Sequence, residues 1–171
     1  LINPFMLKGE LKLFDYQVSA QNISNEYFDM YRNLYKIPLT PSDLSSKLIV
    51  IPESEKDNNL GEKVFSVQQY YDGLKIIGAT LDFKLDSSDS VIVTSVIGQY
   101  YPESEININT TPMISYGQAE DIIAQYMSDN NYQDYTIEKS ELAIWDIGLI
   151  NYNYDLEPHL VWYFEALITD A

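Results

Sequence analysis

The stretch Val64–Leu85, VFSVQQYYDGLKIIGATLDFKL, carries the clearest structural signal in the chain. Asp72-Gly73 separates two runs rich in β-branched and aromatic residues, and an Asp-Gly pair suits the two positive φ angles of a type I′ turn. In the second run hydrophobic and polar residues alternate, as in a strand with one buried and one exposed face. We therefore expect a β-hairpin with arms Lys63–Tyr71 and Leu74–Asp86.

The alternation also assigns the side chains of this hairpin to faces. The residues expected to share the buried face are Phe65, Val67, Gln69 and Tyr71 in the first arm and Ile77, Ala79, Leu81, Phe83 and Leu85 in the second. Alternation of this kind favours an antiparallel sheet with one open face, and a helix is expected on the apolar face.

Shorter signals flank the hairpin. Ser24 can cap a helix over Asn25–Lys36, which carries an aromatic stripe at helical spacing and which Pro38 ends. The other expected elements are a strand over Glu10–Val18, a strand over Lys47–Ile51, a loop over Glu53–Glu62, a turn at Ser87–Ser90 and a strand over Val91–Ile97.

A second unit follows Pro102–Pro112, a stretch without a large apolar cluster that we interpret as a domain boundary. Ser115 and Gln118 fit a capping box at the start of a helix. Its expected buried face comprises Ala119, Ile122, Ile123, Tyr126 and Met127. The expected elements after it are a strand over Thr136–Trp145, a loop over Asp146–Pro158 and a strand over His159–Thr169.

These patterns predict an α+β fold with two helix-on-antiparallel-sheet units, one over residues 1–110 and one over residues 111–171. A hydrophobic content of 46% in 171 residues is typical of a globular chain with a core. No apolar run approaches the roughly 20 residues that span a bilayer, so we expect no membrane insertion. The chain begins with Leu1, which suggests a processed N-terminus after removal of a signal peptide or anchor, and thus an extracytoplasmic protein.

The charge of the chain is strongly acidic. The formal net charge is −16 and the sequence pI is about 4.1, which argues against nucleic acid and anionic lipid as partners. Only Lys139 among the ten basic residues lies after residue 84. The acidic half serves solubility, docks on a basic partner or binds cations.

The sequence gives no support for catalysis. It contains no cysteine, which excludes disulfides and thiolate sites, and a single histidine, which excludes an H-E-x-x-H zinc site. A Ser-His-Asp triad would need His159, but no G-x-S-x-G elbow accompanies it. No glycine-rich nucleotide motif occurs. We therefore expect a protein that is not an enzyme and that uses no cofactor.

Calcium is the one metal for which oxygen ligands are plentiful. The two acidic clusters are Asp86, Asp89 and Ser90 in one turn, and Asp146, Asn151, Asn153 and Asp155 in one loop. Neither has EF-hand spacing, and Asp and Asn are also common turn residues. We therefore predict no metal site.

The fifteen tyrosines offer flat apolar rings with polar tips, which suit the binding of a protein, peptide or sugar. The residues predicted to contact a partner are Tyr70, Tyr71, Asp72, Gly73, Tyr100, Tyr101, Tyr152 and Tyr154. The two tryptophans, Trp145 and Trp162, are expected in the core.

The run Gln69–Ala79, Q-Y-Y-D-G-L-K-I-I-G-A, resembles the FTP domain of thermolysin-like metalloprotease propeptides, and the resemblance extends over residues 24–98. Residues 112–169 are similar to a PepSY domain, which follows FTP in those propeptides. The similar segments there are Ser115–Met127, Leu142–Ile144 and Leu160–Phe164. One departure is that Ser87–Ser90 stands where the family has an Asp-Gly turn.

The resemblance implies a cystatin-like fold and a role as a non-catalytic propeptide of a secreted zinc metalloprotease. Such propeptides help the catalytic domain to fold and then block its cleft until they are cleaved. The implied partner is a metalloprotease catalytic domain, in cis or in trans. The alternative is a stand-alone extracytoplasmic PepSY-like interaction or sensor domain that regulates a membrane or cell-surface partner.

Overall fold

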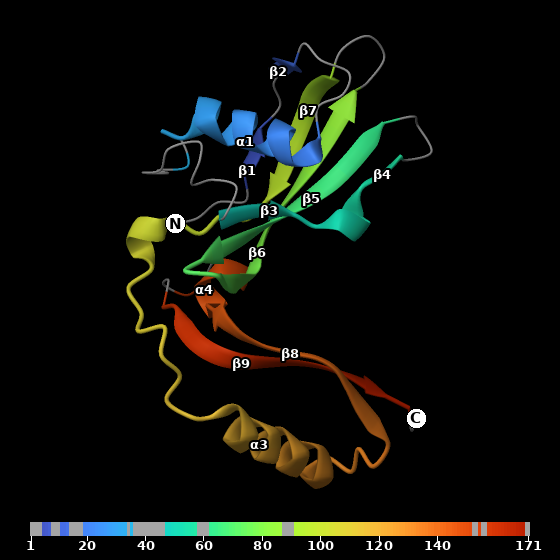
Figure 1. Cartoon of the computed structure of the whole chain (residues 1–171), viewed down its shortest axis with the longest axis vertical. Coiled ribbons are helices and arrows are strands. Elements are labelled where there is room, and N and C mark those ends of the chain that lie inside the picture. Colours follow the sequence, from blue (N-terminus) through green and yellow to red (C-terminus); the bar gives the residue numbers. More distant parts are fainter. Residues whose placement is uncertain are drawn as a thin grey trace.

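The computed structural model describes residues 5–7, 11–13, 19–33, 35, 47–57, 62–86, 91–151, 154 and 157–169. This part of the chain has a mixed α/β fold in which α1 (Ala20–Tyr31) covers one face of an antiparallel-rich sheet (Figure 1). The strands are β1 (Phe5–Leu7), β2 (Leu11–Leu13), β3 (Leu48–Val50), β4 (Lys56–Asp57), β5 (Lys63–Tyr71), β6 (Leu74–Asp86), β7 (Val91–Gly98), β8 (Tyr135–Trp145) and β9 (His159–Ile168). The helices are α1 (Ala20–Tyr31), α3 (Tyr116–Asp129) and α4 (Ile147–Ile150), with 3-10 turns η1 (Pro52–Ser54) and η2 (Glu103–Glu105).

The main part of the sheet has the strand order β1-β7-β6-β5-β3, with β2 also on β7 and β4 also on β5. All of these pairs are antiparallel. The long β8–β9 hairpin joins this sheet through a short parallel pair with β6, in which Lys75 lies opposite Ala143 and Ile76 opposite Ile144. Figure 1 shows the resulting curved molecule, with α1 at one end and α3 at the other.

The expected hairpin is confirmed with the predicted arms, β5 and β6. Asp72 and Gly73 both have positive φ angles, +48° and +78°, as a type I′ turn requires. The strands expected around the hairpin are also present as β3 and β7. Local turn chemistry and alternation are thus sufficient to place the centre of the sheet.

A bulge interrupts the alternation of β6. Between Gln68 and Tyr70, β5 advances by two residues, whereas β6 advances by five, from Lys75 to Thr80. Gly78 accommodates this excess with a φ angle of +85°. The prediction for Ile77 is therefore wrong, because Ile76 is the buried residue in this part of the strand and Ile77 is only half-buried.

The first helix begins earlier than expected. Ser19 is its N-cap and accepts a hydrogen bond from the Asn22 N–H, so α1 precedes the predicted Asn25–Lys36 by five residues at its start. Ser24, the predicted cap, is instead buried inside the helix. Two serines of similar capping chemistry precede the apolar stripe, and burial against the sheet selects the earlier one.

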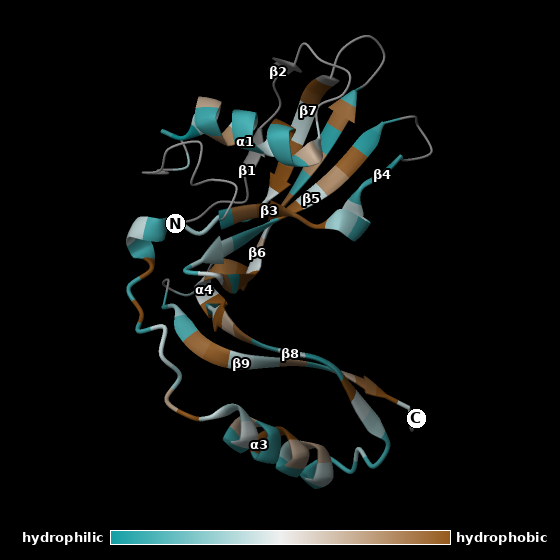
Figure 2. Cartoon of the chain, in the orientation of Figure 1, coloured by the Kyte–Doolittle hydropathy of each residue, from teal (hydrophilic) through white to brown (hydrophobic). Residues whose placement is uncertain are grey.

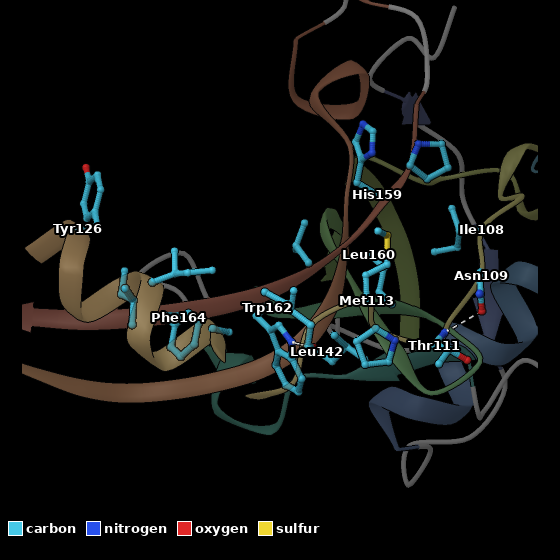
Figure 3. Close-up of a pocket in the computed structure, with 17 residues that line it drawn as sticks. Ile108, Asn109, Thr111, Met113, Tyr126, Leu142, His159, Leu160, Trp162 and Phe164 are labelled. Carbon is cyan, nitrogen blue, oxygen red and sulfur yellow. Dashed lines mark hydrogen bonds between the residues drawn. The ribbon is translucent and has the colours of Figure 1, made fainter. Parts of the chain in front are cut away.

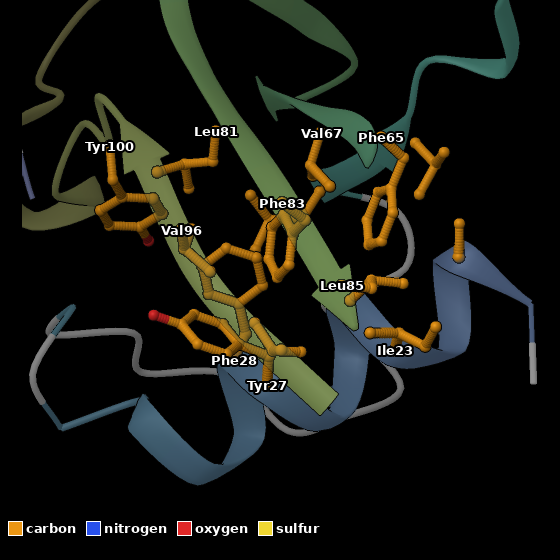
Figure 4. Close-up of a cluster of buried hydrophobic side chains, with 14 of the residues drawn as sticks. Ile23, Tyr27, Phe28, Phe65, Val67, Leu81, Phe83, Leu85, Val96 and Tyr100 are labelled. Carbon is orange, nitrogen blue, oxygen red and sulfur yellow. The ribbon is translucent and has the colours of Figure 1, made fainter. Parts of the chain in front are cut away.

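The aromatic stripe of α1 forms the main core with the sheet (Figure 4). The rings of Tyr27 and Phe28 lie 5.1 Å and 6.0 Å from that of Phe83 on β6, measured between centroids. Tyr35, beyond the helix, shares a hydrogen bond of 3.0 Å with the Tyr27 hydroxyl. Edge-to-face aromatic packing of this kind contributes beyond the burial of area alone, so these residues fix α1 on the sheet.

Two expected loops contain regular structure. The stretch Glu53–Glu62 contributes to η1 and to β4, whose polar residues join the sheet through backbone pairing with β5. The stretch Asp146–Pro158 contains α4, because the Asp146 carboxylate accepts a hydrogen bond of 2.7 Å from the Gly148 N–H and caps the helix. The predictions for Pro38 and Ser87–Ser90 lie outside the described residues.

The second helix starts as predicted, because Ser115 and Gln118 form a capping box. Its apolar face, however, is not the continuous buried surface that we expected. Ala119 and Met127 are buried, but Ile122 is 60% exposed and Tyr126 is 56% exposed. The amphipathic pattern correctly predicts the helix and overstates how much of its face meets the sheet.

The predicted strands of the second unit are present as β8 and β9. Trp145 and Trp162, expected in the core, are only half-buried, because this hairpin is covered less fully than the main sheet. The division of the chain at residue 110 stays a prediction. None of the helices in the described ranges is long and apolar enough to cross a membrane.

Candidate protein interface

The tip of the β5–β6 hairpin is the best defined exposed feature among the predicted contacts. Asp72 and Gly73 are exposed at the turn, and Tyr70 and Tyr71 are half-buried just before it. Tyr70 lies opposite Lys75 in the pairing of the two strands. These residues present one carboxylate and two tyrosine rings at the end of a short two-residue turn.

Cations brace the base of this tip. The Lys47 ammonium lies 6.0 Å from the Tyr71 ring centroid and pairs with the Glu103 carboxylate at 2.8 Å. The Lys75 ammonium lies 3.6 Å from the Glu141 carboxylate and 5.7 Å from the centroid of a second ring, that of Tyr163. The tip is therefore held to neighbouring elements before any partner binds, which lowers the entropy lost on binding.

Beneath the tip, two glutamines satisfy buried backbone groups, Gln68 at the bulge of β6 and Gln69 at Tyr101 after β7. The Gln68 amide donates to the carbonyl oxygens of Ile76 and Ala79 at 2.8 and 3.0 Å. The Gln69 amide donates to the Tyr101 carbonyl at 2.7 Å, and its oxygen accepts from the Tyr101 N–H at 2.8 Å. Both glutamines are buried, so these hydrogen bonds compensate for the loss of water.

The same connection continues to Asp146, between β8 and α4. The Tyr101 hydroxyl donates to the Asp146 carboxylate at 2.7 Å, and that carboxylate also caps α4. Apolar side chains surround the connection: Ile76, Ala79, Ile106, Ile144 and Leu149 form a second buried cluster with the Tyr101 ring. A polar chain inside an apolar cluster thus joins the hairpin to β8 and α4.

These positions correct part of the predicted interface. Tyr100 and Tyr101 were expected to be exposed, but they are 2% and 0% exposed, because both rings pack into cores. Tyr154 is exposed after α4, and Tyr152 lies outside the described residues. The structure therefore brings Tyr70–Gly73 together and assigns the Tyr100–Tyr101 pair to internal packing.

Sequence reasoning missed the structural role of Asp146. An Asp immediately before Ile-Gly is a usable N-cap signal, although the expected loop masked it. This carboxylate belonged to one of the two clusters considered for calcium, and it is buried among protein donors instead. Within the described residues, no group of three or more His, Asp or Glu side chains could hold a metal ion.

Burial of tyrosine predicts instability at alkaline pH. Loss of hydration raises the pKa of Tyr27, Tyr35, Tyr100 and Tyr101 above the usual value near 10, and for Tyr101 the hydrogen bond to Asp146 adds to the shift. The unfolded chain therefore releases these protons first, so the stabilisation is complete below pH 10 and is lost as the pH rises toward the raised values. Each tyrosine contributes a slope of about 1.4 kcal/mol per pH unit there.

Urea unfolding between pH 8 and 12, followed together with tyrosinate absorption, measures this effect. Tyr100→Phe should reduce the dependence of the unfolding free energy on pH by the contribution of one tyrosine, because it removes a titrating hydroxyl and keeps the ring. A chain whose stability does not change up to pH 12 would contradict the burial of these hydroxyls.

The centre of the described fold is similar to a known sequence family. Residues 50–100 match the fungalysin/thermolysin propeptide motif. This FTP segment runs from the end of β3 to Tyr100, and it contains the hairpin, the Gly78 bulge and β7. The FTP motif is found in the propeptides of thermolysin-like proteases. These propeptides, unlike the proteases, are non-catalytic. A comparison with curated protein sequences gave no match.

Proposed function

We propose that this protein is a non-catalytic propeptide module, with inhibitory and chaperone roles, of a secreted thermolysin-like zinc metalloprotease. The observation that carries the proposal is the coincidence of the FTP segment with the braced hairpin, whose exposed tip is Asp72-Gly73. The partner is the catalytic domain, in cis or in trans. The protein acts outside the cytoplasm after removal of a signal peptide or anchor.

The proposal includes a two-unit architecture. In it, the FTP segment and α1 form a cystatin-like unit, and α3 with the β8–β9 hairpin forms a PepSY-like unit. Helix capping by Ser115 and the register of β8 on β9 support a helix-on-sheet second unit. The buried Gln69–Tyr101–Asp146 chain would then keep the two units in a fixed arrangement on the protease.

Inhibition by such a module needs no chemistry of its own. A rigid sheet can place a narrow turn in a cleft, and affinity then depends on a few desolvated side chains at the centre of the contact. The formal charge of −16 can steer the chain toward a basic surface around that cleft. Chaperone activity follows from the same contacts, because a ligand that binds only the folded catalytic domain stabilises it.

Inhibition of a thermolysin-like protease by the purified chain tests the proposal. We expect saturable inhibition with the chain intact on a gel. Tyr70→Ala should raise the inhibition constant about tenfold or more, since truncated aromatic contacts at an interface centre cost at least that factor. The matched control is Tyr132→Ala, which removes an exposed ring far along the chain, after α3.

Two results would count against the proposal. One is rapid degradation of the chain without inhibition. The other is equal inhibition by the Tyr70→Ala and Tyr132→Ala variants. That result would show that the hairpin tip does not contact the protease. Circular dichroism of both variants separates loss of contact from loss of fold.

The alternative is a stand-alone extracytoplasmic interaction or sensor domain built on the same fold. The exposed apolar face of α3, outside the FTP segment, favours a second binding surface of this kind. Crosslinking of the native protein at the surface of its own cell distinguishes the two functions. Capture of a metalloprotease supports the first, and capture of a membrane protein supports the second.

A further inference from the structure

A groove of about 800 Å³ lies between α3, the first half of β9 and the extended segment 108–114 (Figure 3). It lies outside the FTP segment, and no residue of the hairpin tip lines it. Its walls are largely apolar: α3 contributes Ile122, Ile123 and Tyr126, and β9 contributes Leu160, Trp162 and Phe164. Figure 2 shows the hydrophobic stretch in β9 that forms the floor.

The groove stays open because one aromatic residue holds α3 away from the strands. The Tyr116 ring packs on Trp162 and Phe164 with centroids 5.4 and 6.3 Å apart, and its hydroxyl shares a hydrogen bond of 3.1 Å with Ser140. This contact fixes the first turn of the helix. Further along α3 the apolar face is left accessible, which explains the exposure of Ile122 described above. Contiguous exposed apolar surface of this kind marks a binding site.

The floor of the groove also offers unpaired backbone. In the described part of the chain β9 hydrogen-bonds only to β8, so its other edge has no partner strand. The extended segment that forms one wall is attached to this floor, because the Trp162 indole N–H donates to the Ile114 carbonyl at 3.1 Å. An extended peptide with apolar side chains at alternate positions could hydrogen-bond to the free backbone edge of β9 and cover the apolar side chains of the floor.

The charge around the groove selects a basic occupant. The sequence from residue 112 on, which builds most of the groove, contains eleven acidic residues. Three of them, Glu120, Asp121 and Glu157, are neighbours of lining residues in the sequence, are exposed, and have no ion-pair partner among the described residues. Lys139, the one cation of this half of the sequence, is already paired with Glu141 at 2.9 Å. A second copy of this chain would bring a like charge to the site, so a self-dimer is disfavoured and a basic partner is favoured.

We propose that this groove binds an extended segment of a partner protein in which apolar and basic residues alternate. The segment adds as a strand to the free edge of β9, with its apolar side chains between α3 and β9 and its alternate, basic side chains on the opposite face of the sheet, which carries Glu165 of β9. This inference concerns a site separate from the hairpin tip, so it holds or fails independently of the protease partner.

A synthetic peptide of alternating lysine and leucine, blocked at both ends, tests the proposal on the full chain. Binding is followed by the fluorescence of the two tryptophans, one of which lies in the groove. We expect saturable binding that weakens with added salt. The same peptide with glutamate in place of lysine should bind at least about tenfold more weakly, because its charge has the same sign as that of this acidic part of the chain.

A variant pair separates the groove from the rest of the surface. Ile122→Ser should weaken binding about tenfold, because the serine side chain buries much less apolar surface than isoleucine when the peptide binds. Ile97→Ser, an exposed isoleucine on β7, is the matched control and should bind as the parent chain does. Both positions are exposed, so the fold is expected to survive either change.

Strand addition has its own test. Two further peptides carry N-methyl groups on one or the other set of alternate amides, and only one set can face β9. One of the two should bind about tenfold more weakly than the other. The proposal is overturned if no saturable binding occurs, if Ile122→Ser and Ile97→Ser bind alike, if the two methylated peptides bind alike, or if sedimentation shows that the groove closes by self-dimerisation.

Discussion

Gly98→Ala is expected to prevent native folding or to leave only a small folded fraction. Gly98 ends β7 with a φ angle of +148°, which residues with a side chain rarely adopt. A Cβ atom there would lie 2.0 Å from the Thr80 carbonyl oxygen and 2.9 Å from the Leu81 Cα. Both atoms belong to the backbone of β6, so relief requires separation of the two central strands. We expect a loss of about 4 kcal/mol or more, which is a large part of the stability of a domain of this size.

Urea unfolding monitored by far-ultraviolet circular dichroism measures this loss. Gly117→Ala is the matched control, because a Cβ atom at Gly117 has open space around it. That position lies in the first turn of α3, where alanine replaces glycine at no cost or with a gain of up to about 1 kcal/mol. An unchanged unfolding midpoint for Gly98→Ala would show that β6 and β7 do not approach each other as described.

Gln69→Leu is expected to be the most damaging change to a side-chain hydrogen-bonding group. Leucine preserves the approximate volume and leaves both the N–H and the carbonyl of Tyr101 buried without their partner. Each unsatisfied buried group costs about 1–3 kcal/mol, so the sum is about 2–6 kcal/mol. The loss should also loosen the connection to Asp146, since the Tyr101 backbone positions the ring whose hydroxyl reaches that carboxylate.

Native-state hydrogen exchange provides the more specific measurement for this variant. The amides of α4 and of the β6–β8 pair should lose protection more than those of α1, which packs on the opposite core. Gln125→Leu on the exposed side of α3 is the control and should change the stability by less than about 0.5 kcal/mol. Equal loss of protection in α1 and α4 would mean that the two cores unfold as one.

Signals that depend on neighbours in the sequence were sufficient for much of the fold. The Asp72-Gly73 turn needs two positive φ angles, and Ser115 with Gln118 satisfies backbone N–H groups within one helical turn. Neither depends on distant contacts, so the arms of the hairpin and the start of α3 were predicted correctly. The first helix failed at its N-terminus because Ser19 and Ser24 offer the same local chemistry, and only packing on the sheet distinguishes them.

Features that depend on distant contacts could not be predicted. The bulge at Gly78 is stable because Gln68 donates to carbonyl groups eight and eleven residues away in the sequence, which no alternation pattern reveals. The candidate site was predicted in part for the same reason. Tyrosine at a strand end suits either an interface or a core, and the position of Asp146 decides that Tyr101 is internal. The openness of the α3 face depends likewise on Tyr116, whose contacts lie on another element.

The second buried cluster extends beyond the part of the chain that matches the FTP motif. The FTP motif ends at residue 100, but Ile76 and Ala79 inside it share one core with Ile144 and Leu149, which lie more than 40 residues beyond that end. The stretch that matches the FTP motif is thus shorter than the stretch that must be present for its own side chains to be covered. A transplanted FTP segment would carry a bare apolar patch and an unpaired β6 edge into its new host. Exchange between proteins should therefore proceed by larger blocks that include α4, because a boundary drawn from sequence similarity alone divides the second buried cluster.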